Sequence, residues 1–241
     1  MRKDKNQGLQ VYNHYLYKKR LTLIIVAVIT LIGAIYSIGI GSIQIPMKEI
    51  FNVFLGGGEK MHRTAIFNIR LPRAFTALLV GAALAAAGAV MQCVLRNPLA
   101  SASSLGVSQG AAFGASLGIV VFGGGVVNSA NATTAITINN PYIVTICAFI
   151  FGMVSTIVIV GISQLKKNVG PSGLILAGTA LSSLFSGAST ILQYFADDTK
   201  LGAIVFWTFG NLGSTNWKEL SILLLVFLSA LLYFLFNRWN Y

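Results

Sequence analysis

Residues 70–118 read RLPRAFTALLVGAALAAAGAVMQCVLRNPLASASSLGVSQGAAFGASLG. Two apolar runs flank the short polar joint RNPLA at residues 96–100. Each run is close in length to a helix that crosses a bilayer, about 20 residues. Backbone groups inside lipid must be satisfied within the chain, so apolar runs of this kind form helices. The stretch therefore predicts an all-α, polytopic transmembrane helical bundle.

Small residues recur along both runs at helical spacing. The second run carries a glycine every fourth residue, and the first offers Gly81, Ala85 and Gly88 at similar spacing. Positions four apart lie nearly above one another on a helix, and in lipid a bare stripe lets two backbones approach closely. We expect the two runs to pack as a tight hairpin through Gly81, Gly88, Gly106, Gly110, Gly114 and Gly118.

The sequence of this stretch resembles that of one family of membrane proteins, the FecCD-type permeases of ABC importers for ferric siderophores, haem and cobalamin. The matching motifs, in chain order, are Leu71-Pro72-Arg73, LVGAAL at 79–84, Gly88, Gln92, RNPLA at 96–100 and LGV at 105–107. The resemblance implies a permease subunit that works with cytoplasmic ABC ATPase subunits, an extracytoplasmic substrate-binding protein and a second permease subunit. It does not distinguish a ferric siderophore from haem or cobalamin.

Composition supports a membrane protein and excludes other classes. Hydrophobic residues make up 55% of the 241, charged residues 10%, and the mean hydropathy is +0.76, whereas soluble proteins carry about 25% charge. The net charge of +11 lies between apolar runs rather than along one face, which favours membrane orientation over nucleic-acid binding. Cys93 and Cys147 fall inside apolar runs and are typical of buried thiols, not of a disulfide or metal pair.

We divide the chain into a cytoplasmic basic N-terminus, residues 1–20, and a transmembrane permease domain, residues 21–241. Spans are predicted at about 21–41, 74–95, 105–122, 142–162, 174–195 and 220–236. Short outer interfacial helices are expected at 46–55, ended by Gly56-Gly57-Gly58, and from Asp197 or Asp198 to Phe209. Asn97-Pro98 is expected to stop the second span at the inner face.

Charge distribution predicts a multi-pass protein of the plasma or inner membrane with its N-terminus in the cytoplasm. On this topology the inner segments carry ten basic residues and one acidic residue, Asp4, whereas the outer segments carry seven basic and five acidic residues. The inner basic residues are Arg2, Lys3, Lys5, Lys18, Lys19, Arg20, Arg96, Lys166, Lys167 and Arg238. The outer charged residues are Lys48, Lys60, Arg63, Arg70, Arg73, Lys200 and Lys218 with Glu49, Glu59, Asp197, Asp198 and Glu219.

Arg63, Arg70 and Arg73 form a basic group on the side that the insertion rule leaves poor in positive charge. In one interpretation Arg70 and Arg73 extend toward the interface and fix the end of a span. In the other, the arginines bind acidic residues of the extracytoplasmic binding protein, since a guanidinium pairs bidentately with carboxylate. The family resemblance implies docking for Arg70, the residue at the start of the L-P-R motif.

The fifth span has a small, hydroxylated face in which Gly178, Ser182, Ser186 and Thr190 recur every four residues. Such a face either holds helices together by hydrogen bonds or lines a polar path. The resemblance implies that this span lines the translocation path, and that the joint at 168–173 narrows its inner mouth. Pro171 and Ser172 are therefore gate candidates, with the alternative that the joint is an ordinary turn in which Ser172 caps the span.

No catalytic group, cofactor or metal site is predicted. The pair Asp197 and Asp198 is better explained as a helix cap than as an acid/base or metal pair, because no histidine or third carboxylate stands near it. The chain lacks G-x-x-x-x-G-K-[ST], so ATP hydrolysis would belong to another subunit. No carboxylate lies inside a span, which disfavours a secondary transporter.

The resemblance covers essentially the whole chain, but the family has about ten spans, and we expect six here. The cytoplasmic helices that grip the ATPase would follow Tyr241. The main prediction is an importer permease, and the rival is a truncated or split permease that acts only as a membrane scaffold or assembly subunit.

Overall fold

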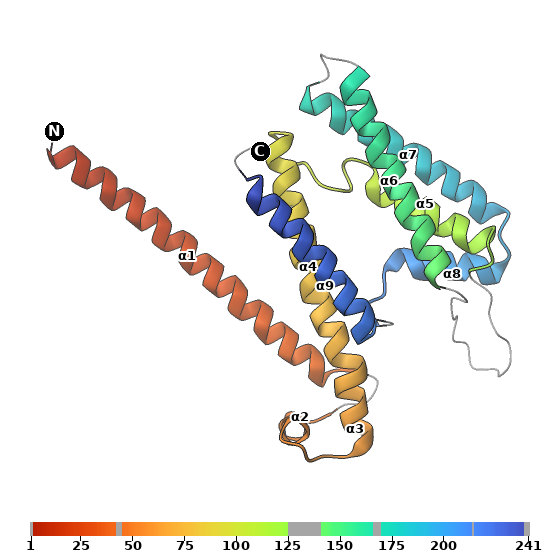
Figure 1. Ribbon diagram of the computed structural model, residues 1–241, viewed down its shortest axis with the longest axis horizontal. Coiled ribbons are helices and arrows are strands. Elements are labelled where there is room, and N and C mark those ends of the chain that lie inside the picture. Colours follow the sequence, from red (N-terminus) through yellow and green to blue (C-terminus); the bar gives the residue numbers. More distant parts are fainter. Residues whose placement is uncertain (1, 42–44, 125–140, 166–169, 214, 239–241) are drawn as a thin grey trace. The chain divides into compact units, whose positions relative to one another are not determined.

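The computed structural model describes residues 2–41, 45–124, 141–165, 170–213 and 215–238, and every regular element within them is helical. The predicted all-α class is therefore confirmed. The elements, coloured along the chain in Figure 1, are α1 (Arg2–Gly39), α2 (Met47–Phe54), α3 (Lys60–Thr64), the π-helical η1 (Ala65–Arg70), α4 (Leu71–Val94), α5 (Val107–Val120), α6 (Pro141–Leu165), α7 (Pro171–Tyr194), α8 (Asp198–Phe209) and α9 (Trp217–Phe236).

Five of the described helices are long and apolar enough to cross a bilayer. They are the part of α1 from Tyr12, the continuous helix Lys60–Val94 made of α3, η1 and α4, and then α6, α7 and α9. Each predicted span overlaps a helix, but α5 has 14 residues, about 21 Å at a rise of ~1.5 Å per residue. That is shorter than a hydrocarbon core of ~30 Å.

Two helices begin well before the apolar runs that predicted them. α1 starts at Arg2 rather than at 21, and the helix that ends at Val94 starts at Lys60 rather than at 74. Charged residues mark where a helix leaves lipid, but Lys and Arg are good helix formers and do not end it. The segment KMHRTAIFNIR contains neither glycine nor proline, so the helix starts directly after the glycine turn at 56–58.

The chain forms two compact units, Met1–Val80 with Leu212–Leu224 and Gly81–Asn211 with Leu225–Tyr241. The core of the first unit consists of buried aliphatic side chains of α2, η1 and their neighbours. Partly buried Ile38, Ala65 and Phe67 pack against it. The core residues are Ile45, Ile50, Val53, Ile66 and Leu71.

The π-helical turn in this unit accommodates Pro72, which follows it in the helix. Leu71 donates its backbone N–H to the carbonyl of Ile66, five residues back, as a π-helix requires. The next such bond would run from residue 72 to Phe67, but proline has no N–H to donate. The indole Nε1 of Trp217 donates to the Phe67 carbonyl instead, at 2.8 Å, so α9 satisfies the acceptor that the proline leaves open.

α4 ends at the polar joint as predicted. The N–H of Arg96 bonds the carbonyl of Cys93 at 3.2 Å, and the N–H of Asn97 bonds that of Gln92 at 3.2 Å, which is the Schellman pattern of a helix end. Arg96 takes the left-handed conformation this motif needs, with φ 46°. The side chain of Asn97 accepts from the N–H of Leu99 at 2.9 Å, and the chain turns at Pro98.

The second unit is built around α5. Its buried core joins α5 to α6 and α8, with Ala111, Val120 and Trp207 packed against it. Three rings from α5, α6 and α7 add an aromatic cluster, with centroids of Phe113 and Phe151 4.9 Å apart and those of Phe113 and Phe185 5.7 Å apart. The core residues are Ala115, Ile119, Val144, Ala148, Ala203 and Ile204.

Candidate functional site

The N-terminus of α5 is fixed at a junction with α6 and α7. Gly106 precedes α5 with φ 79°, a conformation that suits glycine. A Cβ on it would lie 3.1 Å from the Ser155 hydroxyl, 3.1 Å from the Gly178 carbonyl and 3.4 Å from the Ser182 hydroxyl. The fully buried Ser155 donates its hydroxyl to the carbonyl of Leu105 at 3.0 Å. Gly106 therefore marks where three helices converge.

The glycine stripe of α5 packs on the backbone of α6. A Cβ on Gly110 would lie 2.8 Å from the Phe151 carbonyl oxygen, and one on Gly118 would lie 3.1 Å from Val144 Cα. Gly114 is the tightest, since its Cβ would meet the carbonyl of Cys147 and lie 3.0 Å from Ala148 Cα. The helix that approaches this stripe is thus α6.

Gly81 and Gly88 of α4 do not share in that contact. A Cβ built on either would meet no atom of the described chain within 4 Å. The expected hairpin clasp between the first and second runs is therefore wrong within the described residues. Glycine spacing predicts that a helix packs closely, but does not identify its partner.

The hydroxylated face of α7 divides into a packed end and an open end. Gly178 is buried against the loop before α5, where its Cβ would lie 2.7 Å from Leu105 Cα, so it faces protein rather than an open path. Farther along, a surface hollow of about 360 Å³ is lined by Gln109, Ser182, Ser183 and Ser186. Gln109 was not among the predicted path residues, although it lies one residue from the glycine stripe.

The hydroxyls on this face are largely tied to their own helix. Ser182 donates to the carbonyl of Gly178 at 2.8 Å and Thr190 to that of Ser186 at 3.0 Å. A hydroxyl that donates backward keeps its lone pairs as acceptors. Ser186 and Thr190 are exposed in this chain, and their role in a path remains a prediction.

Arg70 makes a structural contact that the sequence did not predict. Its Nη1 donates to the carbonyls of Ile38 at 2.7 Å and Gly39 at 3.1 Å, the last residues of α1. A cationic donor at a helix C-terminus satisfies open carbonyls and complements the helix dipole. Gly41 leaves room for the guanidinium, since a Cβ there would lie 2.9 Å from Nη2.

The other two arginines of the predicted docking group are exposed. Arg63 lies in α3 and Arg73 in the first turn of α4. Arg73 and the partly buried Arg70 also line a hollow of about 560 Å³ with Tyr36, Ser37, Ile40, Gly41, Ala65 and Ile69. Arg63 and Arg73 are therefore exposed on the described chain, whereas Arg70 bonds the end of α1.

The two gate candidates lie in the first turn of α7 and are both exposed. Pro171 is the first residue of the helix and Gly170 is its N-cap, with no side-chain capping bond. The expectation that Ser172 caps this helix is wrong, because Pro171 is its first residue and Gly170 its N-cap, two residues before Ser172. Residues 166–169, including Lys166 and Lys167, lie outside the described residues.

The short helix α8 begins at the predicted cap. Asp197 accepts from the backbone N–H of Lys200 at 2.9 Å, and its carboxylate lies 3.5 Å from Lys200 Nζ. The backbone hydrogen bond from Lys200, and then the charge of its ammonium, hold the pKa of Asp197 below its usual 3.8. Asp197 is therefore the N-cap of α8, as the sequence predicted.

Comparison with known proteins identifies the family to which these features belong. The model of the FecCD transport family matches residues 29–241. A protein of Methanocaldococcus jannaschii named as an ABC transporter permease is 43% identical over 232 residues, which are 96% of this chain and 65% of that protein. The molybdate import permease of Haemophilus influenzae is 34% identical over 86% of this chain and 57% of its own length.

Two further matches agree. The Fe(3+)-citrate import permease of Bacillus subtilis is 33% identical over 84% of this chain and 56% of its own length. A solved inward-facing structure described as a metal-chelate-type ABC transporter matches with a TM-score of 0.70 and 32% identity, over 92% of this chain and 63% of that one. The chain thus spans between about half and two-thirds of the length of the relatives it matches.

Proposed function

Since this chain belongs to the FecCD transport family, we propose that it is a permease subunit of an ABC importer for a ferric siderophore or a related metal chelate. The family and the five apolar helices make it a multi-pass integral membrane protein. We further propose that residues 1–20 lie in the cytoplasm and that 21–241 form the transmembrane permease domain.

The single observation that carries the proposal is the family match over residues 29–241. The geometry supports it through the hollow beside Ser182 and Ser186, a polar surface among otherwise apolar helices. A large polar chelate needs such acceptors along its path, because unpaired polar groups are costly in lipid. The relative named for Fe(3+)-citrate import supports a ferric chelate as the cargo.

In this proposal the chain supplies the path, and other subunits supply energy and substrate. A loaded binding protein would dock near Arg63 and Arg73, whose exposed guanidinium groups suit acidic partners. ATP binding and hydrolysis in separate cytoplasmic subunits would open the path alternately to each side. A second permease subunit would complete the path, and Pro171 and Ser172 would lie at its inner mouth.

Uptake in the native host tests the proposal. Cells that lack the chain should lose uptake of a radiolabelled ferric siderophore, and the wild-type chain should restore it. Haem, cobalamin and molybdate are the competitors that define the substrate class. If cells that lack the chain still take up the siderophore, the importer proposal is wrong. If those cells keep their uptake and the chain also co-purifies with an ATPase, the chain is an assembly subunit.

A matched pair of variants tests the path separately. Ser186→Trp fills the hollow of α7, whereas Leu184→Trp places the same bulk on an exposed site about 200° around the helix. We expect the first variant to reduce uptake and the second to retain it at equal expression. Equal uptake by both would remove this face of α7 from the path.

A further inference from the structure

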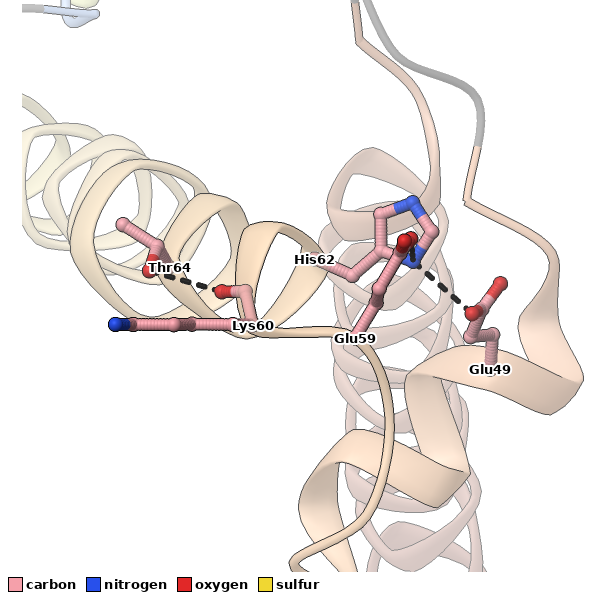
Figure 2. Close-up of polar contacts among 5 residues, drawn as sticks. All are labelled: Glu49, Glu59, Lys60, His62 and Thr64. Atoms are coloured by element: carbon pink, nitrogen blue, oxygen red, sulfur yellow. Dashed lines mark hydrogen bonds and ion pairs between the residues drawn. The ribbon is translucent and has the colours of Figure 1, made fainter.

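Three side chains with metal-binding atoms converge where α2 meets α3. Glu49 lies in α2, Glu59 is the residue before α3, and His62 lies within α3. The His62 Nδ1 atom is 3.0 Å from a carboxylate oxygen of Glu49 and 3.7 Å from one of Glu59. Figure 2 shows the imidazole ring of His62 beside the carboxylates of Glu49 and Glu59, with Lys60 extending away from them.

The nitrogen at the centre of this group is buried but makes no hydrogen bond. The His62 side chain is 13% exposed, and Nδ1 is inaccessible to solvent and has no hydrogen-bond partner. Glu49 Oε1 is near enough to bond it but lies off the direction that an N–H would take. A solvent-inaccessible nitrogen that lies close to two carboxylates but makes no hydrogen bond has unmet bonding capacity.

The backbone keeps the three groups together. The turn between α2 and α3 uses Gly56 at φ 91° and Gly58 at φ 85°, a region that glycine adopts without strain. A Cβ on Gly57 would lie 2.5 Å from the Asn52 side chain, and one on Gly58 would lie 2.6 Å from the Val53 side chain. This tight turn brings Glu59 back toward Glu49.

We propose that Glu49, Glu59 and His62 bind one divalent transition-metal ion of the zinc type. Imidazole nitrogen and carboxylate oxygen are ligands of such ions, and ligand atoms about 2.1 Å from zinc in a tetrahedron lie ~3.4 Å apart. The two nitrogen–oxygen distances bracket that value, and all three ligand atoms lie within 4.8 Å of one another. Glu59 is 70% exposed, so its side chain is free to close the remaining gap.

The ion would fasten α2 to the start of the long helix Lys60–Val94 and leave a coordination position for water. The sequence did not reveal this site, because the ligands come from α2, from the residue before α3 and from α3 itself, and they follow no short metal-binding spacing. The inference does not depend on the proposed transport function.

The test uses the full chain in detergent, stripped with EDTA and titrated with zinc chloride alone. Calorimetry should show one saturable site and thermal unfolding should shift upward with zinc. Cobalt chloride should give the visible absorption of a histidine-containing, low-coordinate site. His62→Gln and Glu49→Gln should each weaken zinc binding by about tenfold or more. Loss of a residue that only hydrogen-bonds to a metal ligand already costs about tenfold in affinity, and loss of a ligand should cost at least as much.

The chain offers an internal control, because it has two histidines and the other, His14, is exposed on α1. His14→Gln should bind zinc as the wild type does. Equal zinc affinity in the wild type and both cluster variants, or no zinc-dependent shift in the wild type, would overturn the proposal and leave His62 as a neighbour of the two carboxylates with no ion between them. Should one variant fail to fold, the other still decides between these outcomes.

Discussion

The guanidinium of Arg70 donates to the carbonyl oxygen of Ile38 at 2.7 Å, which ties the π-helical segment η1 to the C-terminus of α1. The residue expected to receive a binding protein is therefore also a helix cap. Charge at this position supports local structure, so a loss of docking on mutation of Arg70 would have two possible causes. Separating them needs measurements of both stability and binding.

Arg70→Ala should destabilise the chain by about 1.5–3 kcal/mol, the typical worth of hydrogen bonds to a charged group. Arg70→Lys should recover only part of this, because an ammonium lacks the planar fork that reaches two carbonyls. Thermal unfolding in detergent measures both. Wild-type stability of Arg70→Ala would show that the cap contributes nothing measurable.

Arg73→Glu should act on docking with little change in stability, since Arg73 is exposed. If the arginines receive an acidic binding protein, reversing this charge should slow association, most strongly at low ionic strength. Surface-plasmon association rates at two salt concentrations measure the effect. An unchanged rate at low salt would take Arg73 out of the docking surface.

Gly114→Ala should separate α5 from α6, because the new methyl group would overlap the backbone around Cys147 and Ala148. Backbone cannot rotate away as a side chain can, so we expect a loss of about 1–3 kcal/mol, as for overpacked cores. Gly81→Ala is the matched control, since open space surrounds that position. An equal decrease in the thermal unfolding temperature of both variants would contradict the assignment of α6 as the partner of Gly114.

Local signals in the sequence predicted local structure well. The cap at Asp197 and the helix stop at Asn97-Pro98 depend on residues within a few positions of one another, and both are as expected. The glycine stripe of α5 predicted a close helix contact for the same reason. Hydropathy located the apolar runs but placed several helix ends wrongly, because lipid depth and helix length are different properties.

Long-range contacts were beyond the reach of sequence patterns. The hydrogen bonds from Trp217 to Phe67 and from Arg70 to Ile38 join segments far apart in the chain. No spacing in the sequence predicts either of them. The same holds for the choice of α6 as partner of α5, and for the convergence of Glu49 on His62. Each depends on the tertiary arrangement of elements that were individually foreseeable.

Trp217→Phe should expose the effect of Pro72 on its neighbours. The variant keeps a ring near Phe75, whose centroid is 6.1 Å from that of Trp217, but leaves the Phe67 carbonyl without its indole donor. This hydrogen bond is exposed to solvent, so its loss should cost about 0.5–1.5 kcal/mol, the net contribution of a typical hydrogen bond. Pro72→Ala restores a backbone N–H that can donate to Phe67, so the cost of Trp217→Phe should be smaller in that background, as a double-mutant cycle of unfolding free energies would show. Additive effects would refute the link between proline and indole.

The pH dependence of α8 should follow the cap at Asp197. The pKa of this carboxyl is lowered in the folded chain, chiefly by the hydrogen bond from the Lys200 backbone N–H. A lowered pKa means that the cap stabilises the fold fully above the unfolded value near 3.8 and loses this contribution as pH falls through the folded value. Asp197→Asn keeps a capping oxygen that does not titrate. Amide hydrogen exchange in the first turn of α8 should therefore rise with acidification relative to that in the asparagine variant, whereas parallel profiles would show that the carboxylate does not control this helix end.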